Sequence, residues 1–171
     1  VLTGSPGGLA RITALEAAAG YTVDHLTTYT DFVNLTDTQL FEYMHIWDLG
    51  FYNSLNAATQ AQFVKYITQG GAVWWNGENY GGAVFQAKDI SIVNMVTTLG
   101  GGTPTVNSFD PGPSGIESAT IEAEFRLANS ATTTQFARPS YFDSFGTGTP
   151  MCKRVANTAW APVVVWKTGS L

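Results

Sequence analysis

The chain has 171 residues, a length typical of one domain. Charged residues make up only 12% of it, and 13 acidic residues outnumber 8 basic ones, which gives a net charge of −5. The shortage of Lys and Arg argues against nucleic acid as a partner. No apolar run has the length that membrane insertion requires. Because Cys152 is the single cysteine, an internal disulfide and a Cys-rich zinc site are excluded, and we expect no cofactor.

The polarity of the chain comes mainly from Thr, Ser, Asn and Gly rather than from Lys and Glu. This composition favours an extracellular protein or one on a virion or cell surface, although a cytoplasmic protein is not excluded. Asn34-Leu35-Thr36 matches the N-glycosylation sequon, which would be used only in a eukaryotic secretory context. Since Val1 already lies in an apolar run, we expect a processed or partial chain.

The first hundred residues alternate predicted strands with predicted helices. The strands are expected at 1–4, 21–26, 45–49 and 72–75, and the helices at 9–19, from Thr36 or Asp37 to Tyr43, from Ser54 or Asn56 to Gly70, and at 89–99. Alternation at this spacing is typical of parallel strands with helices on both faces. The sequence therefore predicts the α/β class, with a doubly wound, mainly parallel sheet.

After residue 100 the pattern changes. Residues 100–115 hold five Gly and three Pro, which predicts a loop. The segments expected after it are a half-exposed strand at 121–127, an extended loop or irregular hairpin at 128–150, and a final hairpin of 154–157 with 161–166. We therefore expect a single domain over 1–171, in which strand–helix repeats over 1–100 precede a loop-rich, partly β extension over 101–171.

A family resemblance rests on hydrophobic patterns in five passages. These passages are Val1-Leu2-Thr3-Gly4 with its helix, Tyr43 to Gly50, Leu55 to Gly71, Ala72 to Gly82, and Ala161 to Trp166. Together they resemble the class I glutamine amidotransferase-like superfamily, and most of all its ThuA-like and other non-catalytic branches. The resemblance implies a flavodoxin-like three-layer sandwich, with a nucleophile elbow after the fourth strand.

The residues at the expected elbow differ from those of catalytic relatives. Catalytic members of that superfamily carry a cysteine there, and a histidine and a carboxylate follow much later in the chain. Here the elbow reads Gly77-Glu78-Asn79-Tyr80-Gly81, and both histidines, His25 and His45, precede it. The family's acyl-transfer triad therefore cannot form, and we favour a protein that is not an enzyme.

Two carboxylates remain as candidates for chemistry. Glu78 lies where α/β proteins bind ligands, and it is either a general base, a ligand hook or a carboxylate stabilised at a helix N-terminus. Asp48 ends the preceding predicted strand and lies beside Glu78 if the two strands are neighbours. With Asn76 and Asn79 the pair would give only a thin oxygen shell, so we expect no metal. If the chain is an enzyme, Glu78 and Asp48 are its expected catalytic residues.

The other polar candidates have more ordinary explanations. His25 and His45 each lie alone on a predicted strand, where a histidine is more often structural than a ligand. Cys152 lies beside Lys153, which could lower the pKa of the thiol, but a lone cysteine more often behaves as a small apolar residue.

Aromatic residues gather near the predicted strand ends and in the late loop. Burial in a core or interface, and the stacking of sugars, both explain such a set. The residues expected to bind a ligand or form an interface are Trp47, Tyr52, Trp75, Asn79, Tyr80, Tyr141 and Phe142.

The sequence therefore predicts a non-catalytic amidotransferase-like domain. We expect it to act as a structural or assembly module of an extracellular, filament or virion-type polymer, through self-association or contact with other structural subunits. One alternative is a hydrolase that uses Glu78 and Asp48 on a sugar or an amide. Another is a carbohydrate-binding domain with a glycan as its ligand.

Overall fold

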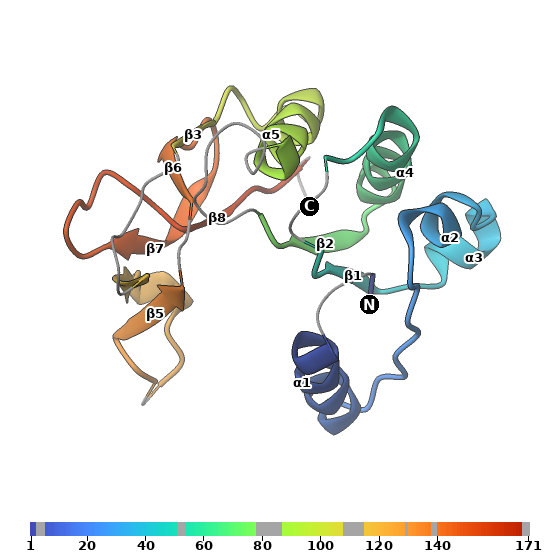
Figure 1. The fold of residues 1–171 in the computed structure, drawn as a ribbon, viewed down its shortest axis with the longest axis horizontal. Helices are drawn as coiled ribbons and strands as arrows, with labels where there is room; N and C mark the ends of the chain where they lie inside the picture. Colours follow the sequence, from blue (N-terminus) through green and yellow to red (C-terminus); the bar gives the residue numbers. More distant parts are fainter. Residues whose placement is uncertain are drawn as a thin grey trace. The chain divides into compact units, whose positions relative to one another are not determined.

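The structure is a computed structural model, and it describes residues 1–2, 6–50, 54–77, 87–107, 115–128, 130–137 and 140–168. The chain divides into two compact units, Val1–Gly77 and Glu78–Leu171. Each unit has its own strands and helices (Figure 1). The expectation of a single domain stays a prediction.

The first unit is built around a parallel pair of strands, β1 (His45–Asp48) and β2 (Ala72–Trp75). Parallel bridges join Leu2 to Asp48 and to Leu26, so the described residues of the two segments predicted as the first strands contribute bridges. The helices of this unit are α1 (Pro6–Ala18), α2 (Tyr29–Val33), α3 (Asp37–Phe41) and α4 (Ala57–Thr68).

Side-chain caps fix where three of these helices begin. The Thr28 hydroxyl accepts from the Asp31 N–H at 3.1 Å, while the Asp31 carboxylate accepts from the Thr28 N–H at 2.9 Å. Thr36 caps α3 in the same reciprocal way, and Asn56 caps α4. The helix starts predicted near Thr36 and Asn56 are therefore confirmed, whereas α2 was not predicted.

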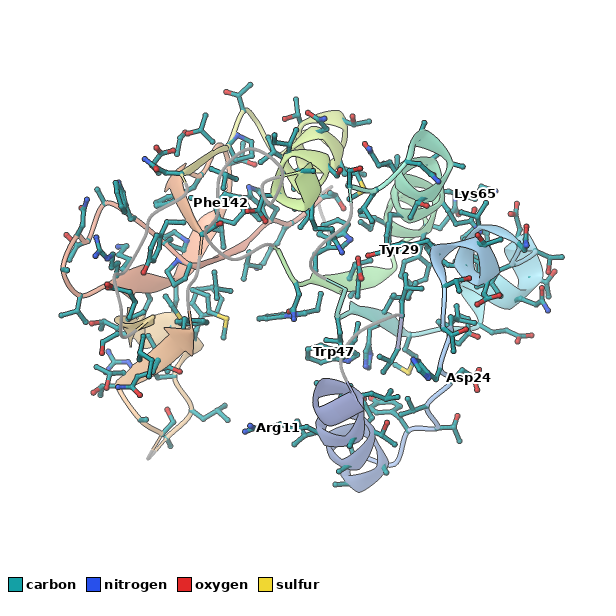
Figure 2. The ribbon with its side chains drawn as sticks, viewed as in Figure 1. Arg11, Asp24, Tyr29, Trp47, Lys65 and Phe142 are labelled. Atoms are coloured by element: carbon teal, nitrogen blue, oxygen red, sulfur yellow. The ribbon has the colours of Figure 1, made fainter. Side chains whose placement is uncertain are left out.

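The β1–β2 pair has two distinct faces, because side chains alternate along a strand. Asp48 and Trp75 point to one face, where Phe63 of α4 packs edge-on against Trp75 with ring centroids 5.6 Å apart. His45 and Trp47 point to the other face, toward α1. Figures 1 and 2 show α1 and α4 on opposite sides of the pair, with Trp47 on the α1 side.

The second unit is mainly antiparallel. Its larger sheet has four strands in the order β5-β4-β7-β8, and its smaller sheet pairs β3 with β6. The elements in chain order are α5 (Ala87–Thr98), β3 (Thr105–Asn107), β4 (Ile116–Ile121), the 3₁₀ helix η1 (Ala123–Phe125), β5 (Thr133–Ala137), β6 (Tyr141–Ser144), β7 (Thr149–Arg154) and β8 (Val163–Val165).

The prediction of a doubly wound, mainly parallel sheet in a flavodoxin-like sandwich is wrong. In the described residues the parallel strands form one pair, and the largest sheet is antiparallel. Two features account for the difference. In the first unit, Leu2 and Leu26 form isolated parallel bridges outside the named strands, and in the second unit the connections between sheet neighbours are short. Residues 122–132 link β4 to β5, and residues 155–162 link β7 to β8. Both links are shorter than the crossover of about a dozen or more residues, usually helical, that parallel neighbours need.

The C-terminal third holds more strand than was expected. The strand predicted at 121–127 is displaced, because β4 ends at Ile121 and η1 follows it. Residues 128–150, predicted as a loop or irregular hairpin, contain β5 and β6. A final hairpin is present, since β7 pairs with β8, but the predicted first strand at 154–157 is wrong, because β7 covers Thr149–Arg154 and ends where that strand was expected to begin.

A buried ion pair lies on the inner face of the four-stranded sheet. Arg154 of β7 is 8% exposed and donates to the Glu117 carboxylate from Nε at 2.9 Å and from Nη2 at 3.2 Å. Its guanidinium also lies 5.4 Å from the ring centroid of Tyr141 and 5.5 Å from that of Trp160. The hydrogen bonds to Glu117 raise the pKa of Arg154, which keeps it charged. Two parallel hydrogen bonds offset part of the desolvation cost of both groups.

Replacing one partner of this pair tests its role. Glu117→Gln keeps the shape of the side chain but leaves a buried guanidinium without a counter-charge. We expect the free energy of unfolding to fall by about 3 kcal/mol, as measured by urea denaturation near neutral pH. Glu124→Gln, at an exposed position of η1, is the matched control and should cost less than about 0.5 kcal/mol. Equal losses of unfolding free energy in the two variants would contradict a stabilising role for the ion pair.

Candidate functional site

Asp48 lies at the carboxyl end of β1 and is fully buried, with 0% of its surface exposed. Its carboxylate accepts hydrogen bonds from the Tyr29 hydroxyl at 3.0 Å and from the Gly50 N–H at 3.2 Å. Figure 2 shows Tyr29 on the side of β1 away from α1. The Asp48 carbonyl accepts from the Asn76 N–H at 2.8 Å, just after β2. The supposition that the two strands are neighbours is confirmed.

These contacts favour a structural role for Asp48. A general base must reach the proton that it removes, either directly or through one water. Asp48 instead accepts from the Tyr29 hydroxyl and the Gly50 N–H, and its side chain is shielded from solvent. By linking Tyr29 in α2 to the turn at Gly50, the carboxylate fixes the chain where it leaves β1.

Several predicted site residues lie outside the described residues, namely Tyr52, Glu78, Asn79 and Tyr80. The pairing of Glu78 with Asp48, and the hydrolase that would use it, therefore stay predictions.

Trp47 and Trp75, both predicted to bind a ligand or form an interface, lie on opposite faces of the parallel pair. Trp75 packs against Phe63 on the α4 side. Its indole Nε1 is buried without a hydrogen-bond partner among the described residues. Trp47 is half-buried on the α1 side. A single ligand therefore cannot stack on both rings from one face of this sheet.

The predicted contact residues of the second unit pack inside that unit. Tyr141 is 1% exposed, and its ring centroid lies 5.7 Å from that of Trp160. Burial is the main cause that raises the pKa of Tyr141 to about 12. Phe142 packs edge-on against Trp166 with centroids 5.1 Å apart. Cys152 is 3% exposed, and burial raises the pKa of its thiol, so this cysteine is a poor nucleophile.

A row of rings lies on the α1 side of the first unit and was not predicted from the sequence; we call it the aromatic row. The distances between neighbouring centroids are 5.6 Å for Tyr21 and His45, 6.2 Å for His45 and Trp47, and 5.6 Å for Trp47 and Trp74. The two ends are the most open, with Tyr21 41% and Trp74 37% exposed. Alternation along β1 and the parallel register, which sets Trp47 opposite Trp74, were the signals that could have found it.

Glu16 ties the aromatic row to α1. Its Oε1 accepts from Trp47 Nε1 at 2.7 Å and lies 2.9 Å from His45 Nε2. Because an ionised carboxylate only accepts hydrogen bonds, His45 Nε2 carries a proton. Burial raises the pKa of Glu16, but the hydrogen bonds with His45 and Trp47 outweigh it and hold that pKa below its ordinary value. One carboxylate oxygen thus fixes the orientation of two rings in the row.

Among the residues that the structure describes, no three His, Cys, Asp or Glu side chains are grouped so that they could hold a metal ion. Among those residues, too, no helix combines the length and the apolar character needed to cross a membrane.

Comparisons with known proteins add no relative. No protein-family model matches the chain, and neither a curated protein nor a solved structure gives a significant match. The resemblance to the amidotransferase-like superfamily therefore stays a prediction from sequence patterns, and function must be argued from the geometry of the described residues.

The Glu16 contact predicts a pH-dependent stability. Glu16→Gln replaces a charged acceptor with a neutral one, so we expect the free energy of unfolding at neutral pH to fall by about 1–2 kcal/mol. Because folding lowers the pKa of Glu16, its ionisation stabilises the fold above the ordinary pKa of a glutamate. That stabilisation is lost as the pH falls through the folded-state pKa.

The difference in unfolding free energy between wild type and Glu16→Gln should therefore shrink below about pH 4. Urea denaturation at a series of pH values measures it. Glu42→Gln, at an exposed position just after α3, is the control and should show little difference at any pH. A Glu16 effect that did not change with pH would argue against the ionised contact.

Proposed function

We propose that this chain is a structural module that works by self-association rather than by catalysis. The observation that carries the proposal is one face of the four-stranded sheet, which we call the outer face. The exposed positions of this face that the structure describes include Ile116, Ser118 and Thr120 of β4, Thr133 and Gln135 of β5, and Val155 directly after β7, and all of these are uncharged.

The outer face carries exposed aliphatic surface close to the middle of the sheet. Ile116 is 54% exposed and Val155 is 55% exposed. The Val155 N–H donates to the Ser118 carbonyl at 3.0 Å, so Val155 continues the β7 ladder beside β4. Two partly buried charged residues, Lys153 and Glu122, also lie on this face, and they form an ion pair with each other at 3.3 Å. The face therefore presents apolar and hydroxyl groups whose nearby charges are already balanced.

Such a face fits a second copy of the same kind of surface better than a charged partner. Covering exposed aliphatic groups contributes about 25 cal/mol per Å² of apolar area removed from water. Few charges on the contact also mean little repulsion between copies. The low charge and Thr-rich composition of the chain favour a filament or virion-type polymer outside the cell as the setting.

The burial of Asp48 and Cys152 supports a structural role in a different way. These two side chains are among the groups that catalysis most often uses, yet each is buried. Their buried positions favour a role in the stability of the fold over chemistry on a substrate.

Self-association is the first property to measure. We expect the mass of the wild-type chain in light scattering to rise with concentration and to change little with added salt, since the contact is not electrostatic. Negative-stain electron microscopy should show regular assemblies. Ile116→Lys should weaken association about tenfold or more. Ile90→Lys adds the same charge at a 52% exposed position of α5 and should leave association unchanged. A wild-type chain that stays monomeric up to its solubility limit would contradict the proposal.

Carbohydrate binding is a second candidate, favoured by the aromatic row. Exposed rings such as Tyr21 and Trp74 offer flat faces on which sugars stack, and Glu16 holds the middle of the row in place. If a glycan array yields a ligand, Trp74→Ala should weaken its binding about tenfold or more without altering the melting temperature. Met44→Ala, at a 68% exposed position outside the row, should leave binding unchanged. Silence of the array, or equal loss in both variants, would remove this candidate.

A further inference from the structure

The strand β5 ends the four-stranded sheet, and its one strand partner among the described residues is β4. The Ile121 N–H donates to the Thr132 carbonyl at 2.9 Å, which marks this pair as hydrogen-bonded. Hydrogen-bonded pairs recur at every second residue of an antiparallel ladder. Even-numbered residues of β5 therefore bond to β4. The N–H and C=O groups of Thr133, Gln135 and Ala137 point away from β4, toward the outer edge of the sheet.

The hydrogen bonds on the other side of β4 agree with this assignment. The Ser118 carbonyl accepts from Val155, and the Glu122 N–H donates to the Met151 carbonyl, both at 3.0 Å. Even-numbered residues of β4 thus bond to β7, which leaves its odd-numbered residues for β5. The parity of the β5 edge follows from two independent sets of contacts.

Within the described residues, the β5 edge lacks the features that normally protect such an edge. Natural edge strands are commonly blocked by lysine, proline or a bulge. From Ala128 to Ala137 the sequence holds no charged residue and no proline. The register with β4 continues without a shift over the whole of β5, and the side chains of Thr133 and Gln135 are exposed. The edge is therefore regular and uncharged, which suits it to pairing with another strand.

We propose that the β5 edge pairs antiparallel with the β5 edge of a second copy of this chain, about a two-fold axis at Gln135. This inference rests on the proposed function, because it names a further contact, beside the outer face, through which the structural module would associate. The outward residues are evenly spaced about Gln135. When the two Gln135 residues lie opposite each other, each Thr133 lies opposite an Ala137, and the outward N–H and C=O groups of both copies meet in hydrogen-bonded pairs.

A second copy fits this edge for reasons of symmetry and charge. The same residues serve on both sides, as an isologous contact requires. No charged side chain of β5 meets a like charge across the axis. The pairing also covers two unprotected edges at once and joins two four-stranded sheets into one continuous sheet. An unrelated extended peptide could make the same hydrogen bonds, but one peptide would cover the edge of one copy only.

A charge exchange at the two-fold axis tests the pairing directly. In Gln135→Lys two lysines would face each other across the axis, and in Gln135→Glu two glutamates would. Like charges directly opposite in a ladder destabilise it. We expect each variant alone to dimerise about tenfold or more weakly than wild type in sedimentation velocity. An equimolar mixture sets lysine opposite glutamate and should recover the dimer. Ile90→Lys is the control for added charge and should dimerise as wild type does.

Two proline variants test the parity of the edge. Gln135→Pro removes an outward N–H and no hydrogen bond to β4, so it should abolish the dimer while the unfolding midpoint in urea stays close to that of wild type. Thr134→Pro removes an N–H that bonds to β4, so it should lower the unfolding midpoint clearly. Equal losses of stability in the two variants would overturn the assigned parity.

The outcomes separate this inference from the proposed function. If wild type associates and Gln135→Lys associates equally well, the β5 edge is not the contact, while self-association stands. If both single variants lose the dimer and their mixture does not regain it, pairing about Gln135 is overturned. If wild type is monomeric at every concentration, the inference and the proposed function fail together.

Discussion

The strand β4 is hydrogen-bonded on both sides, and this constraint determines most features of the second unit. Its odd-numbered residues face β5 and its even-numbered residues face β7. Side chains alternate in the same rhythm, so Glu117 and Ala119 point inward while Ile116 and Ser118 point outward. The inward Glu117 meets Arg154, and the outward residues form the uncharged outer face. A slip of one residue would exchange the faces, exposing Glu117 and burying Ser118.

Each unit has a charged side chain that several partners contact. In the second unit the guanidinium of Arg154 has Glu117 on its edge and the ring of Tyr141 against its face. In the first unit the carboxylate of Glu16 is shared by the rings of His45 and Trp47. In both places the charge orients aromatic rings, which are bulky and whose positions define the surrounding packing. The charged side chains of Arg154 and Glu16 therefore help to fix the positions of the aromatic side chains around them.

The sequence was informative where structure is decided locally and misleading where it is decided by pairing. The caps at Thr36 and Asn56 and the short strands β1 and β2 depend on neighbouring residues, and they were predicted. The alternating residues 121–127 also look like a strand, but η1 interrupts them after Ile121. The Thr-rich segment of β5 has too few apolar residues to show a period, so its strand was missed. The aromatic row depends on the parallel register between β1 and β2, which composition and periodicity do not contain.

The four-stranded sheet is continued beyond β8 but not, among the described residues, beyond β5. This difference limits the size of the assembly that edge pairing can form. Beyond β8, Ala161 and Phe142 exchange two hydrogen bonds of 2.9 Å, so β6 continues the ladder, and α5 packs against the short strand β3 that follows. The described part of the chain supplies no such continuation at β5.

Pairing through one edge about a two-fold axis gives a closed dimer, so it cannot by itself produce a filament. A longer polymer therefore needs a second contact on each copy. The outer face, with Ile116 and Val155, lies perpendicular to the edge and remains available after the edges join. In such a polymer the β5 edge would define the dimer and the outer face would connect the dimers.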